Sequence, residues 1–304
     1  MPNSIMPVLH SAVIIMTPLL FAATGGYFTK LAGMLNIALE GLLLAGAFAA
    51  ITAMYFTGNF AAGIAAAVFA SVALSALLAF AILYLRSNVF ISGLAINLLA
   101  GGLTIVLSHY IFNTRGVVAL QETRFLPLVE IPLIADIPVI SRILSGYSVY
   151  VYAGWLLLVL AGIAVYKTPF GYRLRACEKH TDVLISLGIS PVKYRFAAFI
   201  VSGFFCGIGG SFLSLNLGAF VPNMTAGKGW IALVVIFLGG RKPPGLFAAA
   251  FVFGLTEAFS NYAQGPSLRA LNIPADLILA IPYLFMLIAM VLVSIREKNP
   301  VSGR

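Results

Sequence analysis

Two acidic residues, Glu40 and Glu257, lie well inside apolar runs, where an ionised side chain is costly. Asn36 and Asn97 lie at a similar depth in two such runs, and Trp230 opens a third. If the run around Glu40 is one helix, Asn36 precedes it by one turn on the same face. Carboxylates, amides and an indole could line a path for a polar solute. The alternative is structural, because Asn and Glu also bond neighbouring helices or cap a broken one, and Trp often lies at a membrane interface.

The patterns that serve common catalytic chemistry do not occur in the sequence. It contains no G-x-x-x-x-G-K-[ST] phosphate-binding loop. His10, His109 and His180 are scattered without the spacing of metal ligands. Cys177 and Cys206 lie in a basic loop and an apolar run, which does not favour a disulfide. We therefore expect no enzymatic activity, cofactor or metal site in this chain.

The composition is that of a membrane protein. The chain has 304 residues, of which 61% are hydrophobic and 9% charged, and its mean hydropathy is +1.05. A soluble domain carries about 25% charged residues, so too few are present here to coat a globular surface. This excludes a soluble enzyme and a disordered chain. The net charge of +9 fits basic residues retained in cytoplasmic loops better than a nucleic-acid-binding stripe.

Apolar runs separated by charges, Pro and Gly predict an all-α polytopic protein of about nine transmembrane segments. One predicted segment is too short to cross the bilayer and is flanked by helix breakers, which is typical of a broken or re-entrant helix. Its string IALVVIFLGG (231–240) is similar to IALEGLLLAG (37–46), so the chain could contain an inverted repeat. The predicted segments are 8–28, 31–56, 60–85, 89–113, 148–166, 193–218, 229–240, 245–264 and 273–294.

The distribution of basic residues predicts the orientation. Two hydrophilic connections stand out, at 114–147 and 167–192. If 167–192 and the C-terminus are cytoplasmic, thirteen of the 18 Lys and Arg residues lie inside, and the reverse orientation would put thirteen outside. The N-terminus and the 114–147 connection are then outside. The five outer basic residues are Arg115, Arg124, Arg142, Lys228 and Arg269.

The cytoplasmic connection contains a predicted helix from Leu174 to Leu187, which Gly188 ends and Pro191 keeps from resuming. Its mixture of apolar residues with charges of both signs is typical of a helix that docks into a groove of a partner. A helix lying in the lipid interface is the alternative, but a purely basic polar face would suit it better. The candidate docking residues are Arg175, Glu178, Lys179, His180, Thr181, Asp182, Leu187 and Gly188.

Four strings resemble the membrane permease subunits of bacterial ATP-binding-cassette (ABC) importers for nucleosides and simple sugars, related to the ribose and branched-chain amino-acid permeases. They are LNIALEGLLLAGAF (35–48), SGLAINLLAGGLT (92–104), TPFGYRLRACEKHTDVLISLGIS (168–190) and GKGWIALVVIFLGGRKPPGLFAAAFVFGLTEAF (227–259), and the similarity spans about 35–295. The N-I-x-x-E-G string of the family is matched by Asn36, Ile37, Glu40 and Gly41. The resemblance implies that these residues lie near the translocation path.

The resemblance also implies the partners. Two permease subunits, identical or different, would sit over two ATPase subunits that bind ATP and Mg²⁺, and an extracytoplasmic binding protein would deliver the substrate. The coupling helix of the family would fall at about Ala176–Gly188. Where relatives usually have Gly-Glu-Asn-Pro, this chain has Cys177-Glu178-Lys179-His180.

We therefore expect residues 1–304 to form one permease domain in the bacterial cytoplasmic membrane, surrounded by lipid and without a nucleic-acid partner. The resemblance favours nucleosides, with simple sugars or riboflavin as alternative substrates. An ion-coupled secondary transporter is the second alternative, with Glu40 or Glu257 as the titrating acid, and a purely structural membrane component is the third.

Overall fold

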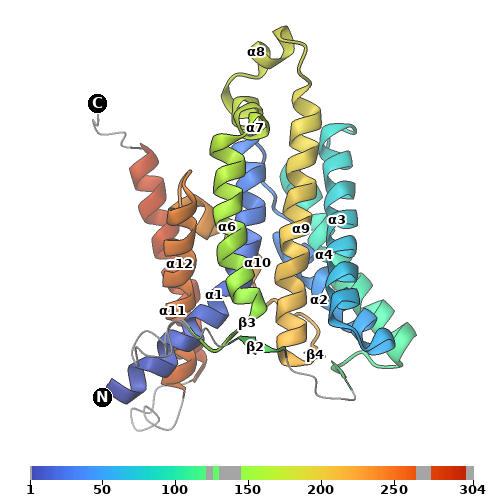
Figure 1. Ribbon diagram of the computed structural model, residues 1–304, viewed down its shortest axis with the longest axis vertical. Helices are drawn as coiled ribbons and strands as arrows, with labels where there is room; N and C mark the ends of the chain where they lie inside the picture. Colours follow the sequence, from blue (N-terminus) through green and yellow to red (C-terminus); the bar gives the residue numbers. More distant parts are fainter. Residues whose placement is uncertain (1, 121–125, 130–144, 265–274, 299–304) are drawn as a thin grey trace.

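The computed structural model describes residues 2–120, 126–129, 145–264 and 275–298 (Figure 1). Among these residues, seven helices are long and apolar enough to cross a membrane, and two shorter apolar stretches lie in α10 and α12. The helices are α1 (Pro2–Leu31), α2 (Leu39–Thr57), α3 (Phe60–Leu83), α4 (Val89–Phe112), α6 (Val149–Lys167), α7 (Pro169–Lys179), α8 (Thr181–Ser186), α9 (Pro191–Leu217), α10 (Lys228–Leu238), α11 (Pro243–Ala263) and α12 (Ala275–Lys298).

The all-α polytopic class is confirmed, and each of the nine predicted segments coincides with a helix. The helix ends follow ordinary capping chemistry. The side chains of Asn59 and Asn88 accept hydrogen bonds from the first backbone N–H groups of α3 and α4, and the left-handed Gly58 and Gly218 end α2 and α9. The short segment is α10, with eleven residues. It is only about half the length needed to span the hydrocarbon core.

The prediction of one helix over 31–56 is wrong. The helix α1 ends at Leu31, α2 begins at Leu39, and the residues between them are not helical. Gly33 has a φ of +77°, and the Oδ1 of Asn36 accepts a hydrogen bond from the backbone N–H of Ala38 at 3.0 Å. Such local bonds compete with helix formation. Asn36 therefore does not share a helix face with Glu40.

The helix α9 lies at the centre of the bundle, against α1, α2 and α3. Its glycines allow these close approaches, because a Cβ on Gly207 would lie 2.6 Å from the Cα of Val68 on α3. Serine hydroxyls on α3 complete the packing. Ser75 donates to the carbonyl of Phe199 on α9 at 2.6 Å, and Ser71 donates to that of Leu42 on α2 at 2.7 Å.

The two ends of the bundle differ (Figure 1). At one end α7 and α8 project beyond the long helices, and α12 runs towards this end. At the other end lie the start of α1 and two antiparallel strand pairs. The strand β1 (Val118–Ala119) pairs with β4 (Ala219–Phe220), and β2 (Leu128–Val129) pairs with β3 (Tyr147–Ser148).

Much of the predicted 114–147 connection lies outside the described residues. Three predicted outer residues therefore lie outside the described residues: Arg124 and Arg142 in this connection, and Arg269 before the C-terminal helix. Residues 299–304, with the C-terminal Arg304, are likewise outside the described ranges.

Candidate functional site

The carboxylate of Glu40 holds the start of the short helix α10. Glu40 lies in the first turn of α2, and its Oε1 accepts a hydrogen bond from the N–H of Gly227 at 2.8 Å. Its Oε2 accepts one from the N–H of Gly229 at 2.6 Å. These N–H groups have no partner within α10, and the positive end of the helix dipole favours a negative charge there. Glu40 therefore caps the start of α10 in this structure. We name this arrangement the Glu40 clasp.

The starts of α2 and α10 meet at the Glu40 clasp because of two glycines. Gly227 adopts a φ of +82°, which turns the chain into α10. A Cβ on Gly229 would collide with the backbone of Glu40. The two segments that sequence similarity suggested as repeats, 37–46 and 231–240, therefore contain helices that begin side by side after a break.

Asn97 joins α4 to the break between α1 and α2. Its Nδ2 donates to the carbonyl of Ile37 at 2.9 Å, and its Oδ1 accepts from the N–H of Gly41 at 2.7 Å. The amide thus satisfies backbone groups that the interrupted helix leaves open.

Asn36 is buried, with 1% of its surface exposed. Its Nδ2 donates to Ser202 Oγ on α9 at 2.8 Å, while its Oδ1 makes the turn described above. Both ends of the amide are therefore occupied within the chain, in keeping with a structural role in holding the break.

Glu257 pairs with Lys228, whose Nζ lies 2.6 Å from its Oε1. The sequence analysis placed Lys228 among the outer loop residues and did not foresee this pairing. A cation at a helix N-terminus is unfavourable unless a carboxylate neutralises it. Glu257 neutralises Lys228, and the carboxylate of Glu40 binds the residues on either side of it, Gly227 and Gly229. Trp230 follows in the first turn of α10 and is half-buried. The structure thus gathers Glu40, Lys228, Trp230 and Glu257 around one end of α10.

The connection at 167–192 contains two helices, so the prediction of one helix from Leu174 to Leu187 is wrong. The helix α7 begins earlier, at Pro169, where Thr168 Oγ1 accepts from the N–H of Gly171 at 3.2 Å. His180 interrupts the helix with φ −128° and ψ 41°, and α8 then runs from Thr181 to Ser186. The predicted end at Gly188 agrees with its φ of +73°.

The predicted docking residues divide into two groups. Five of them are exposed to solvent: Lys179, His180, Asp182, Leu187 and Gly188. Arg175 and Thr181 make contacts within the chain. Arg175 lies over the rings of Tyr166 and Tyr172 at 4.7 and 5.0 Å, and Thr181 Oγ1 donates to the carbonyl of Cys177 at 2.9 Å.

Glu178 was predicted to be a docking residue, but its carboxylate is bound within the chain. Both of its carboxylate oxygens lie 2.7 Å from the Nη2 of Arg241, in the turn between α10 and α11. The sequence analysis missed Arg241, and also Arg195 on α9, which donates to the carbonyls of Cys177 (2.8 Å) and Ala32 (3.2 Å). These contacts join residues far apart in the chain, so no local spacing could have revealed them.

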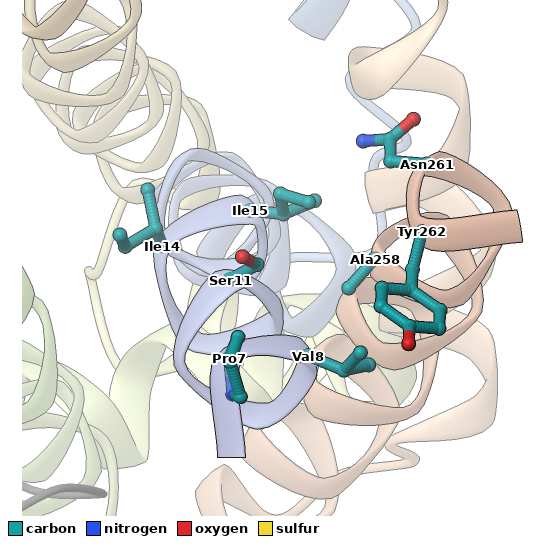
Figure 2. A pocket seen from close by; sticks show the side chains of 8 residues that line it. All are labelled: Pro7, Val8, Ser11, Ile14, Ile15, Ala258, Asn261 and Tyr262. Atoms are coloured by element: carbon teal, nitrogen blue, oxygen red, sulfur yellow. The ribbon is translucent and has the colours of Figure 1, made fainter. Parts of the chain in front are cut away.

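Two cavities flank α1. One, of about 490 Å³, lies at its α7 end and is lined by Lys30, Gly33, Met34, Leu35, Glu178, Phe237, Gly240 and Arg241. The other, of about 290 Å³, lies between α1 and α11 near the start of α1, and Figure 2 shows its mainly apolar side chains with the polar groups of Ser11, Asn261 and Tyr262. Neither cavity contains the Glu40 clasp. Within the described ranges, no group of three or more His, Cys, Asp or Glu residues could hold a metal ion.

The sequence was compared with known protein families and matches one of them. Residues 8–293 match the family described as the branched-chain amino acid transport system permease component. The guanosine ABC transporter permease of Bacillus subtilis is 31% identical, over 93% of this chain and 90% of its own length. The nucleoside ABC transporter permease of Lactococcus lactis is 30% identical, over 95% and 93%.

Two further comparisons extend the similarity. A putative glucose ABC transporter permease of Haloferax volcanii is 30% identical over 86% of this chain and 78% of its own length. Among solved structures, an inward-facing putative metal-chelate type ABC transporter aligns with a TM-score of 0.51 at 14% identity, covering 94% of this chain and 85% of that one. At that identity the structural match speaks for the fold alone.

Proposed function

The chain belongs to the branched-chain amino acid transport system permease family, and we propose that it is the permease subunit of an ABC importer that takes up nucleosides. In this proposal a separate ATPase subunit binds ATP and Mg²⁺ and hydrolyses the ATP. The permease itself converts the movement of that subunit into alternating access.

The observation that carries the proposal is the exposed apolar surface of α8. Val183, Ile185 and Leu187 are 56%, 60% and 68% exposed, on an element that projects beyond the bundle (Figure 1). Their neighbours Asp182 and Lys179 are charged and exposed. Apolar anchors inside a polar rim are the usual composition of a docking surface. We assign this surface to the ATPase.

The proposed substrate follows from the relatives. Permeases for guanosine and for nucleosides are 31% and 30% identical to this chain over more than nine-tenths of its length. A simple sugar is the second candidate, favoured by the putative glucose permease at 30% identity. A binding protein outside the membrane would select between them.

The proposed orientation puts α7 and α8 in the cytoplasm and the start of α1 outside, in the cytoplasmic membrane of the cell. A second permease subunit, identical or different, would complete the path. We propose that this path passes the breaks at the starts of α2 and α10. The residues that would line it are those around the Glu40 clasp, together with Asn97 and, when the helices separate, Asn36.

Reconstitution tests the proposal. The chain is co-expressed with its proposed partner ATPase and binding protein, placed in proteoliposomes, and supplied with a radiolabelled purine nucleoside or glucose. We expect nucleoside uptake that requires ATP. Uptake without the ATPase and driven by an ion gradient would replace the ABC proposal with secondary transport.

The docking surface is tested on the same complex. Ile185→Ala and Leu187→Ala should reduce co-purification of the ATPase by roughly tenfold, because buried apolar anchors dominate such interfaces. The matched control is Leu98→Ala, which truncates an exposed leucine on the bundle surface of α4. Equal ATPase recovery from all three variants would contradict the assignment.

A further inference from the structure

We propose that the ion pair between Glu178 and Arg241 transmits movement from the cytoplasmic helices to the Glu40 clasp. This inference rests on the proposed function, since it supposes that a partner moves α7 and α8. It adds a specific route, in which the short helix α10 carries that movement from the cytoplasmic end of the bundle to the two helix breaks.

The first step of the route is the ion pair itself. Glu178 lies in the last turn of α7, and both of its oxygens are 2.7 Å from Arg241 Nη2. Both oxygens contact the same guanidinium nitrogen, so this is a short charge-assisted contact that holds the end of α7 close to the turn. The two side chains are 27% and 50% exposed. Exposed pairs of this kind add little stability, so a contribution to fold stability does not by itself explain it.

The second step is the attachment of Arg241 to the bundle. Its carbonyl oxygen accepts hydrogen bonds from Tyr27 on α1, at 2.6 Å, and from Tyr166 on α6. The turn that carries Arg241 is therefore held through its backbone by two long helices and through its side chain by α7. A shift of α7 against those helices acts on this turn.

The third step is α10. It ends at Leu238, three residues before Arg241, and its other end is held by Glu40. Eleven residues of helix are about 16 Å long and too short to bend appreciably. A displacement at Arg241 therefore arrives at Gly227 and Gly229, whose N–H groups bind the Glu40 carboxylate. The helix α10 is thus a rigid connection between the ion pair and the Glu40 clasp.

The surroundings of the ion pair allow movement. The cavity of about 490 Å³ lies beside it and is lined by both of its residues. Two other lining residues, Gly33 and Gly240, have φ values of +77° and +63° and lie at the ends of α1 and α10. These glycines allow the tight turns that bring the ends of α1 and α10 to the ion pair, and the open space beside it leaves room for its side chains to shift.

The experiment compares four proteins in the reconstituted importer with its ATPase and binding protein: Glu178→Ala, Arg241→Ala, the double alanine variant, and the charge exchange Glu178→Arg with Arg241→Glu. Uptake and ATP hydrolysis are measured together. Each single variant should lower the number of substrate molecules transported per ATP by roughly threefold to tenfold, the range expected for one coupling contact. The double variant should lose no more than a single one.

The matched control is Arg173→Ala, on the same helix. Arg173 Nη1 donates to the hydroxyl of Tyr194 on α9 at 2.8 Å, so its hydrogen bond joins α7 to α9 and not to the α10–α11 turn. It should leave transport per ATP unchanged. The charge exchange should restore at least half of the wild-type ratio, which a merely structural role would not predict. If a single alanine variant fails to assemble, Glu178→Gln and Arg241→Gln give the same comparison, because each removes one charge of the pair.

The outcomes separate this inference from the proposed function. A wild-type protein that takes up substrate without ATP would overturn both. Normal ATP-driven uptake in the wild type, with additive losses in the double variant or unchanged ratios in both single variants, would overturn the ion-pair route and leave the permease assignment intact.

Discussion

At the residue scale, the Glu40 clasp makes the sharpest prediction. Glu40→Ala removes two charge-assisted hydrogen bonds at the start of α10, each worth about 1.5–3 kcal/mol, and leaves buried N–H groups open. Glu40→Gln keeps one acceptor and should fall between alanine and wild type. Thermal unfolding of the detergent-purified protein gives the order, with the exposed Asp182→Asn as control. An alanine variant as stable as the control would refute the clasp.

Cys177 gives a prediction about reactivity and pH. Burial raises the pKa of its thiol above the usual range, and the nearby Arg195 offsets this only in part. A raised pKa keeps the group protonated at pH 8, so the reactive thiolate is scarce. Maleimide should therefore label Cys177 far more slowly than a cysteine placed at the exposed Ser186, measured by mass spectrometry of the peptides. Equal labelling rates would contradict the burial.

From the sequence, Glu40 and Glu257 could each be interpreted as a pathway residue or as a structural, helix-capping residue. A carboxylate near a glycine-rich break is a reasonable helix cap, and the chemistry of capping is local. The partner of Glu257 is Lys228, 29 residues away, and that of Glu178 is Arg241, 63 residues away. Such pairings depend on how helices pack, which no spacing along one helix encodes.

At the scale of elements, the contact between α2 and α10 depends on a missing side chain. Gly229→Ala places a methyl group against the backbone of Glu40 and should force the two helices apart. Overpacking of this kind costs about 1–3 kcal/mol. Gly101→Ala on α4 is the control, because a Cβ there meets nothing within 4 Å. The melting temperatures should drop for Gly229→Ala alone; equal values would mean that the contact is loose.

The long helices were predicted correctly, because the length of an apolar run determines them, and each of the nine predicted runs overlaps a helix. The breaks that local hydrogen bonds determine were not predicted. The gap before Leu39 was missed because the apolar run continues through it, although Gly33 and Asn36 carry the signals of a turn. The division at His180 was missed for a similar reason, since the flanking sequences on both sides favour helix.

At the scale of the whole molecule, the proposed orientation can be tested with two single cysteines. Arg115→Cys lies just beyond α4 and Ser186→Cys on α8, both exposed and at opposite ends of the bundle. A membrane-impermeant maleimide should label the first in intact cells and the second only in inverted vesicles. The buried Cys177 and Cys206 should contribute little background. The reverse pattern would invert the topology and remove the docking assignment.

The bonds of Asn97 have a mechanical consequence. By bonding Ile37 in the gap and Gly41 in the first turn of α2, this amide fastens α4 to the junction where the gap passes into α2. We therefore expect a shift of α4 to carry the start of α2 with it. A shift of α2 away from α10 would have to break both hydrogen bonds of Glu40, so this one carboxylate sets the resistance to separating the two helix starts.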